Sequence, residues 1–267
     1  MEKMPKKRRK NSFSFLDVVN ILLIVYLVFP ILVIVVFSFN PSTSGVFPMT
    51  GFTLKWYKSL AGNKLILQSL VNSIYVGIAA SVISVLIGTL ASFALTRYKF
   101  KFKNIINFFV LVPISLPAIL LGISLLSFYS QLNIEKSLLT VVISHVLFCI
   151  PFVVLVMNSR LEGFDIAVEE AAKDLGANTF QTFKYITMPL IRPSLIGVIM
   201  LAFALSFDEF LVTFFTVGTQ NTLPLIIWSM LRRGVSPVIN AIATLVLIFS
   251  MGLVILANKF AQMRLKI

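Results

Sequence analysis

Long apolar runs alternate with short polar segments along most of this 267-residue chain. An α-helix needs roughly 20 mostly apolar residues to cross the hydrocarbon core of a bilayer, and these runs reach that length. Within lipid the backbone must satisfy its own hydrogen bonds, which a helix does along each segment. The pattern therefore predicts an all-α integral membrane protein with six transmembrane helices. Their expected ranges are 16–39, 70–95, 105–128, 138–157, 193–217 and 238–257.

Basic residues are distributed unevenly between the polar segments. The cluster Lys6-Lys7-Arg8-Arg9-Lys10 precedes the first apolar run, which is too long for a signal-peptide core and lacks a small-residue cleavage site, so it is expected to be an uncleaved span. Of the 23 Lys and Arg residues, 17 fall in segments 1–15, 97–103, 158–192 and 258–267. Because basic segments stay on the cytoplasmic side, both termini and the polar segment 158–191 are expected to be cytoplasmic.

The polar segment 158–191 holds an unusual share of the charge, since five of the ten acidic residues fall between Glu162 and Asp174. Its helical pattern separates an apolar face from a charged face, and Glu169 and Lys173 are spaced as a favourable i,i+4 pair on the charged face. The apolar face is Val168, Ala171, Ala172 and Leu175, and the charged face is Glu169, Glu170, Lys173 and Asp174.

Two short helices are expected in this segment. Gly176 suits the left-handed conformation that ends the first helix. Asn178 or Thr179 can cap a second helix from about 180 to 187, which Pro189 is expected to limit. Such a helix–turn–helix is suited either to docking on another protein or to lying on the membrane surface as an amphipathic connector.

Composition narrows the class of protein. Charged residues make up 12% of the chain, against about 25% in soluble domains, and hydrophobic residues make up 58%. A net charge of +13 would suggest a nucleic-acid partner in a soluble protein, but orientation in an anionic membrane explains it here, so membrane lipid is the expected partner and nucleic acid is not. The single cysteine, Cys149, and the single histidine, His145, lie in an apolar run, so no metal site is expected and His145 is expected to be a packed, hydrogen-bonded helix residue.

The sequence lacks the motifs of an enzyme. No G-x-x-x-x-G-K-[ST] phosphate-binding loop and no nucleophile–base set is present, so neither catalytic residues nor cofactors are expected. If ATP energises the function, a separate subunit must bind it.

Two adjacent acids, Asp208 and Glu209, interrupt the fifth apolar run. Charged groups inside a membrane span are costly, so the pair is a functional-site hypothesis, with a structural pair that bonds another helix as the alternative. Asp208 lies about 22 Å along the helix from Pro193, towards the outer side, and neighbouring residues point about 100° apart, so the two acids cannot face the same path. In the third run, Pro113 and Pro117 predict a kink that either shapes the helix or lines a path.

Two external segments carry weaker signals. The aromatic stretch 52–57 is expected either at the outer membrane interface or against an external partner. The apolar run 225–230 is too short to span and is expected to be interfacial or re-entrant.

The spacing of residues in segment 158–191 resembles the EAA loop of ABC importer permeases. The resemblance is carried by Glu170-Ala171-Ala172, then Gly176 after three intervening residues, Ile186 after nine more, and Pro189. Met188 stands where the family usually has Leu. The resemblance implies a type I ABC importer permease fold, in which this cytoplasmic loop forms a coupling helix held in a groove of the ATP-binding subunit. It assigns ATPase coupling to Glu170, Ala171, Ala172, Gly176, Ile186 and Pro189.

Motifs towards the C-terminus resemble the second permease subunit of spermidine/putrescine transporters. They are A-L-S-F-D-E-F at 204–210, T-F-F at 213–215, T-L-P at 222–224, Met230 with Arg232, G-V-S-P at 234–237 and I-N-A at 239–241. Arg233 stands where that subunit more often has an aromatic residue. The likeness covers most of the chain from about Leu70 onward. It implies a multi-pass, non-enzymatic subunit of the bacterial plasma (inner) membrane that works with a second, homologous permease, an ATPase dimer and an extracytoplasmic polyamine-binding protein.

The acidic pair fits a polycationic substrate. A carboxylate in a low-dielectric path would offset part of the cost of desolvating a polyamine. Asp208 is the first choice for this role and Glu209 the second, and Phe210 and Phe214 are expected to add cation–π contacts.

Three alternatives are left open by the residues. The same kind of permease could carry another small solute, such as iron, thiamine, phosphonate or sulfate, although an anion would sit badly beside the acidic pair. An ion-coupled secondary transporter would use the pair for protons but leaves the EAA spacing unexplained, and a membrane-embedded hydrolase lacks a nucleophile–base set. The expected division is 1–67 (basic segment, first helix and external loop), 68–258 (permease transmembrane domain) and 259–267 (cytoplasmic tail).

Overall fold

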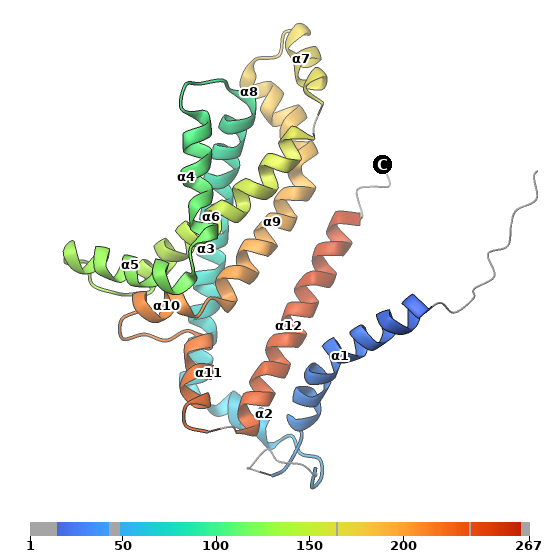
Figure 1. Ribbon diagram of the computed structural model, residues 1–267, viewed down its shortest axis with the longest axis vertical. Helices are drawn as coiled ribbons and strands as arrows, with labels where there is room; N and C mark the ends of the chain where they lie inside the picture. Colours follow the sequence, from blue (N-terminus) through green and yellow to red (C-terminus); the bar gives the residue numbers. More distant parts are fainter. Residues whose placement is uncertain (1–14, 43–48, 164, 235, 263–267) are drawn as a thin grey trace, which may run out of the picture.

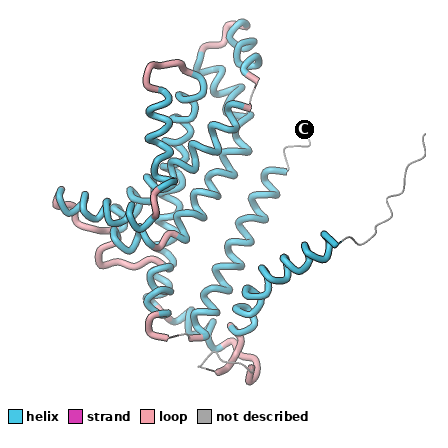
Figure 2. Tube along the Cα trace, viewed as in Figure 1, coloured by secondary structure: helices cyan, strands magenta, loops and turns pink. Residues whose placement is uncertain are grey.

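The computed structural model describes residues 15–42, 49–163, 165–234 and 236–262, and across these ranges the regular secondary structure is helical (Figures 1 and 2). The basic cluster Lys6–Lys10 and the terminal Arg264 and Lys266 lie outside the described residues. The elements in chain order are α1 (Phe15–Phe37), α2 (Lys55–Gly62), α3 (Lys64–Arg97), α4 (Lys103–Ser115), α5 (Ala118–Gln131), α6 (Leu138–Glu162), α7 (Ile166–Asp174), α8 (Thr179–Thr182), the π-helix η1 (Phe183–Thr187), α9 (Met188–Asp208), α10 (Leu211–Thr216), α11 (Leu223–Leu231) and α12 (Pro237–Gln262).

The core is a bundle of α3, α6 and α9, in which α3 packs along both of the others. Small residues on α3 let the helices approach closely, and its serines bond across to α6: Ser92 Oγ donates to the carbonyl of Val154 at 3.3 Å and Ser84 Oγ to that of Val146 at 3.4 Å. A buried cluster that includes Val85, Val153 and Val198 joins the three helices. This bundle holds the end of α9 that carries Asp208 and the end of α3 that carries Arg97.

Gly88 of α3 lies in close contact with Val153 of α6. A Cβ at this position would lie 2.6 Å from Cγ1 and 2.9 Å from Cβ of Val153, which is fully buried and has no room to move. Gly88→Ala is therefore expected to destabilise the protein by about 1–3 kcal/mol, seen as a lower thermal midpoint of the purified protein in detergent. Gly252→Ala in α12 is the matched control, because its added Cβ meets nothing within 4 Å. Equal midpoints for the two variants would contradict this packing.

Among the described residues, four helical segments are long and apolar enough to cross a membrane: α1, α3, α6 and the continuous stretch Thr179–Asp208. The pair α4 and α5 passes the same test together but is bent by 108°, and the described apolar part of α12, Pro237–Leu253, is shorter. The kink predicted from the two prolines is therefore present, but it breaks the segment into two helices. Leu116, held extended (φ −84°, ψ 132°) as residues before proline prefer, is where the chain turns. The count of six spans stays a prediction.

The fifth predicted span, 193–217, is wrong at both ends. The helix begins at Thr179 and runs through η1 into α9, so Pro189 does not limit it. The amide of Met188 bonds to the carbonyl of Phe183, and this π-type turn is followed by Pro189 at the second position of α9. At the other end the helix stops after Asp208, because Glu209 is extended (φ −71°, ψ 111°).

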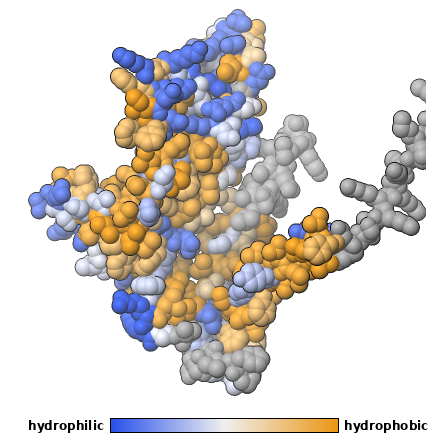
Figure 3. Space-filling view, viewed as in Figure 1, coloured by the Kyte–Doolittle hydropathy of each residue, from blue (hydrophilic) through white to orange (hydrophobic). Residues whose placement is uncertain are grey.

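The outer surface reflects a membrane environment. Figure 3 shows hydrophobic side chains over the middle of the bundle and hydrophilic ones gathered at the end that carries α7. Helix α1 stands away from the bundle, is apolar and exposed along most of its length, and packs against α12 (Figure 1). The aromatic stretch 52–57 contributes to α2, where Trp56 Nε1 donates to the carbonyl of Asn40 at 2.7 Å. The short run 225–230 forms most of α11.

Candidate functional site

Helix α7 and the turn after it follow the local signals in the sequence. Asp165 caps α7, its Oδ1 accepting from the amide of Ala167 at 3.0 Å. Gly176 is left-handed (φ +90°), as predicted, and the amide of Ala177 after it bonds back to the carbonyl of Ala172 at 3.0 Å. Asn178 caps α8 through reciprocal bonds with Gln181, of 2.9 Å and 2.8 Å. The prediction that Asn178 or Thr179 would cap this helix is thus confirmed for Asn178.

Glu169 is not on the exposed charged face where the pattern placed it. Its side chain is buried, and its carboxylate pairs with the Arg97 guanidinium at the end of α3, at 3.0 Å (Nε to Oε2) and 3.3 Å (Nη2 to Oε1). The hydroxyl of Thr187 in η1 donates to Oε1 at 2.8 Å, and Arg97 Nη1 donates to the carbonyl of Leu161 in α6 at 3.0 Å. The predicted pairing with Lys173 is therefore wrong. One buried carboxylate and one arginine instead tie α7, α3, α6 and η1 together.

The apolar side chains of this segment are turned outward. Leu175 is 90% exposed and Val168 44% exposed, so the stripe predicted on one face of α7 faces away from the bundle. Farther along, Phe180 and Tyr185 are also exposed. Among the residues that resemble the EAA loop, Glu170, Ala171, Gly176 and Pro189 are exposed, and Ala172 and Ile186 are half-buried. The segment therefore has a buried ion pair on its inner side and an exposed apolar face on its outer side.

The break between α9 and α10 is held by His145 of α6. Its Nδ1 lies 2.7 Å from Ser206 Oγ in α9, and its Nε2 lies 2.8 Å from Thr213 Oγ1 in α10. Because the Thr213 hydroxyl donates its proton to the carbonyl of Glu209 at 2.8 Å, Nε2 must be the donor to Thr213, and Nδ1 then accepts from Ser206. All three side chains are buried. His145 is thus the packed, hydrogen-bonded residue predicted, and its bonds span the break.

The side chains of Asp208 and Glu209, the two acids at this helix break, lie in different environments. Glu209 is half-buried, and its Oε1 accepts from the amide of Val212 at 2.9 Å, which satisfies a free donor at the start of α10. Asp208 is exposed, and among the described residues no basic side chain pairs with it. It lines two cavities, which share four of their lining residues. The two carboxylates diverge, as predicted, but they do so at a helix end, because Glu209 is extended.

The two cavities beside Asp208 are bounded by α9, α11 and α12. The small cavity, of about 190 Å³, is lined by Phe207, Asp208, Phe210, Leu223, Pro224, Ile227, Trp228, Leu231 and Val246. The large cavity, of about 730 Å³, lies between α9 and α12 and shares Phe207, Asp208, Ile227 and Val246 with it. Phe214 lines neither cavity and packs on Phe210, with ring centroids 5.8 Å apart. Trp228 is a site residue that the sequence does not single out, because it lies in a run that indicates only a short external segment.

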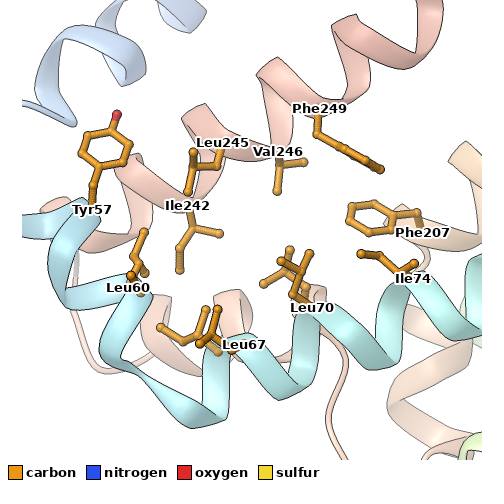
Figure 4. Close-up of a pocket in the computed structure, with 13 residues that line it drawn as sticks. Tyr57, Leu60, Leu67, Leu70, Ile74, Phe207, Ile242, Leu245, Val246 and Phe249 are labelled. Atoms are coloured by element: carbon orange, nitrogen blue, oxygen red, sulfur yellow. The ribbon is translucent and has the colours of Figure 1, made fainter.

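A third cavity, of about 420 Å³, lies between α2, α3 and α12 (Figure 4). Side chains such as Leu70, Ile242 and Phe249 line it, Tyr57 lies at its edge, and the lining is almost wholly apolar. Asp208 does not line it. It therefore offers no group that would recognise a charged solute.

Residues 84–263 match the family described as the binding-protein-dependent transport system inner membrane component. The chain is 39% identical over 242 residues to the spermidine/putrescine transport system permease protein PotC of Escherichia coli (strain K12), covering 90% of this chain and 91% of PotC. It is 35% identical over 230 residues to the putrescine transport system permease protein PotI of the same strain, covering 83% of this chain and 82% of PotI.

Solved structures share the fold at low sequence identity. A bacterial ABC transporter that imports alginate superposes with a TM-score of 0.69 at 18% identity, covering 96% of this chain and 99% of that one. The MetNI methionine ABC transporter, in inward-facing conformations, superposes with a TM-score of 0.65 at 15% identity, covering 74% of this chain and 95% of that one. A bacterial alginate transporter in complex with an alginate pentasaccharide-bound periplasmic protein superposes with a TM-score of 0.68 at 12% identity, covering 94% of this chain and 93% of that one. From the family match over about two thirds of its length, and from the relatives that share most of it, the chain belongs to the inner membrane components of binding-protein-dependent transport systems.

Proposed function

We propose that this chain is one of two permease subunits of an ATP-driven importer that carries polyamines, spermidine or putrescine, across the bacterial plasma membrane. The observation that carries the substrate class is Asp208, a carboxylate without a basic partner among the described residues, at a helix break and beside two otherwise largely apolar cavities. Such a group inside a membrane protein attracts a cationic solute and repels an anionic one. The polyamine permeases to which the chain is similar support the same class.

In the proposed arrangement the chain spans the membrane six times, with both termini in the cytoplasm. The bent pair α4 and α5 counts as one span and α12 as the sixth. This arrangement is supported by charge, because it places the four basic segments, 1–15, 97–103, 158–192 and 258–267, on the cytoplasmic side of the membrane. Helix α7 lies in one of them. The exposed Asp208 belongs to a path completed by the second permease.

Within the path, we assign the substrate contact to Asp208 and a mainly structural part to Glu209, because Glu209 already accepts from an amide of α10. Phe210 borders the small cavity and offers its ring to a cation. Phe214 lines neither cavity, and its proposed part in the path is indirect, through its packing on Phe210.

Coupling to ATP runs through the exposed apolar face of α7 and the residues Glu170, Ala171, Ala172, Gly176, Ile186 and Pro189. An ATP-binding dimer that covers this face would move it when the dimer closes. Arg97 and Thr187 would pass that movement to α3 and α9 through Glu169. The permeases then rock about their interface and open the path alternately to each side. An extracytoplasmic binding protein delivers the polyamine, as the alginate transporter is seen in complex with its own periplasmic protein.

Gly176→Val is expected to uncouple ATP hydrolysis from uptake. A β-branched residue is strained at φ +90°, while its Cβ meets nothing within 4 Å, so the change acts on the turn alone. We expect uptake into proteoliposomes to fall at least about tenfold, since a strain of about 1–2 kcal/mol favours another turn geometry, while hydrolysis continues. Gly176→Asn is the matched control, because Asn tolerates a left-handed backbone. Uptake by Gly176→Val equal to that of the wild type would refute the coupling role.

The substrate is tested by uptake of radiolabelled spermidine into proteoliposomes that hold this chain, the second permease and the ATPase, with loaded binding protein outside. We expect ATP-dependent accumulation that unlabelled putrescine reduces and sulfate leaves unchanged. ATP-dependent accumulation of an anion in place of spermidine would refute the polyamine substrate but leave the assignment as an ATP-driven importer intact. Accumulation driven by a proton gradient without ATP would instead favour a secondary transporter.

A further inference from the structure

The small cavity joins one carboxylate to three aromatic rings. Of its nine lining residues Asp208 is the charged one, and Phe207, Phe210 and Trp228 are aromatic. The rings of Phe210 and Trp228 lie with centroids 5.2 Å apart and planes tilted by 46°. Trp228 is 45% exposed, so part of its indole is open to an incoming group.

This set of groups suits an alkylammonium ion better than any other simple chemistry. The carboxylate takes the positive charge, and a tryptophan face is the strongest of the side-chain π partners for a cation. Leu223, Ile227 and Val246 offer apolar surface to methylene groups. An anion would be repelled by the Asp208 carboxylate. An apolar solute would displace water from that carboxylate without replacing the lost hydrogen bonds.

The size of the cavities adds a constraint. The small cavity has about a quarter of the volume of the large one, 190 Å³ against 730 Å³, and Asp208 lines both. The small cavity therefore fits one end of an extended amine, and the large cavity takes the rest of the chain.

Building on the proposed function, we propose that the small cavity is the subsite for a terminal primary ammonium group of the substrate. The ammonium lies between the Asp208 carboxylate and the Trp228 indole, with Phe210 behind it. The remaining methylene and amino groups extend past Asp208 along the large cavity. Trp228 is thus a specificity residue for linear amines with a primary ammonium at one end.

The test compares Trp228→Leu with Trp228→Phe in the complete importer in proteoliposomes, with saturating spermidine-loaded binding protein so that its own affinity does not enter. Loss of a desolvated cation–π contact is expected to lower uptake by Trp228→Leu about tenfold. Trp228→Phe keeps a π face and is expected to stay within about threefold of the wild type. Phe108→Leu, which removes an exposed ring of α4 remote from Asp208, is the control.

A structural role for Trp228 predicts a different set of results. The two Trp228 variants would then act alike, and assembly or ATPase activity stimulated by the loaded binding protein would fall with uptake. Uptake by Trp228→Leu within about twofold of the wild type would overturn the subsite. If that variant fails to assemble, Phe210→Leu tests the same cavity from its other wall, and unchanged uptake there overturns the proposal equally. Absence of spermidine uptake by the wild type would instead remove the proposed substrate.

Discussion

Asp208→Asn is expected to reduce polyamine uptake at least about 30-fold, with assembly and binding of the ATPase intact. The substitution keeps the size of the side chain and removes its charge. Removing one member of a desolvated charge pair costs about 2 kcal/mol or more, which corresponds to that factor. Asp208 is exposed in the single chain and makes no ion pair with a described residue, so little of the effect should come from folding. The measurement is spermidine uptake into proteoliposomes beside the amount of ATPase that copurifies.

Two acids serve as controls for this variant. Glu209→Gln keeps an oxygen that can accept from the amide of Val212, so it tests the neighbouring charge with the start of α10 preserved. Glu135→Gln removes an exposed charge in the turn between α5 and α6. We expect a smaller loss for the first and none for the second. Full uptake by Asp208→Asn with loss in Glu209→Gln would move the substrate contact to Glu209.

Features set by neighbouring residues could be predicted from the sequence. The left-handed Gly176 and the cap at Asn178 depend on contacts within a few residues, and both are present. The apolar stripe of α7 is predictable for the same reason, because a period of 3.6 residues is a local property. The divergence of Asp208 and Glu209 is predicted from helical spacing, but it arises at a helix end, because Glu209 is extended.

Features that depend on distant partners could not be predicted. Glu169 pairs with Arg97, 72 residues earlier in the chain, and no local pattern distinguishes that arginine from the other basic residues of its segment. The break at Glu209 lies inside an apolar run that resumes after the acidic pair, so the hydropathy of the flanking residues does not mark the end of a helix. The acidic pair is the sequence feature that coincides with the break, but two adjacent acids are as compatible with the middle of a helix as with its end. Pro189 by itself suggests a helix boundary, yet a π-type turn accommodates it.

Arg97→Gln is expected to abolish ATP-driven uptake by loosening α7 from the bundle. The Arg97 side chain is 9% exposed and that of Glu169 is 6% exposed, so the substitution leaves a buried carboxylate without its cation. Breaking a buried pair in this way costs about 3–5 kcal/mol, enough to displace a loop held by few other contacts. We expect the ATPase to be lost from the purified complex, or retained with hydrolysis that no longer follows the loaded binding protein. Copurification and ATPase stimulation measure the two effects. Arg160→Gln is the control, an arginine that bonds the carbonyl of Leu190 from an exposed position.

The double variant Arg97→Gln/Glu169→Gln distinguishes an ion pair from simple loss of side-chain packing. Replacing both partners of a buried pair is much less harmful than removing one, because no uncompensated charge is left behind. Thr187 can still donate to the amide oxygen that Glu169→Gln introduces, which keeps η1 attached to α7. The double variant should therefore retain more ATPase than Arg97→Gln alone, with a coupling energy of about 0.5–3 kcal/mol between the two sites. Additive losses would mean that the two side chains act independently, and the path from α7 to α3 would have to run through other contacts.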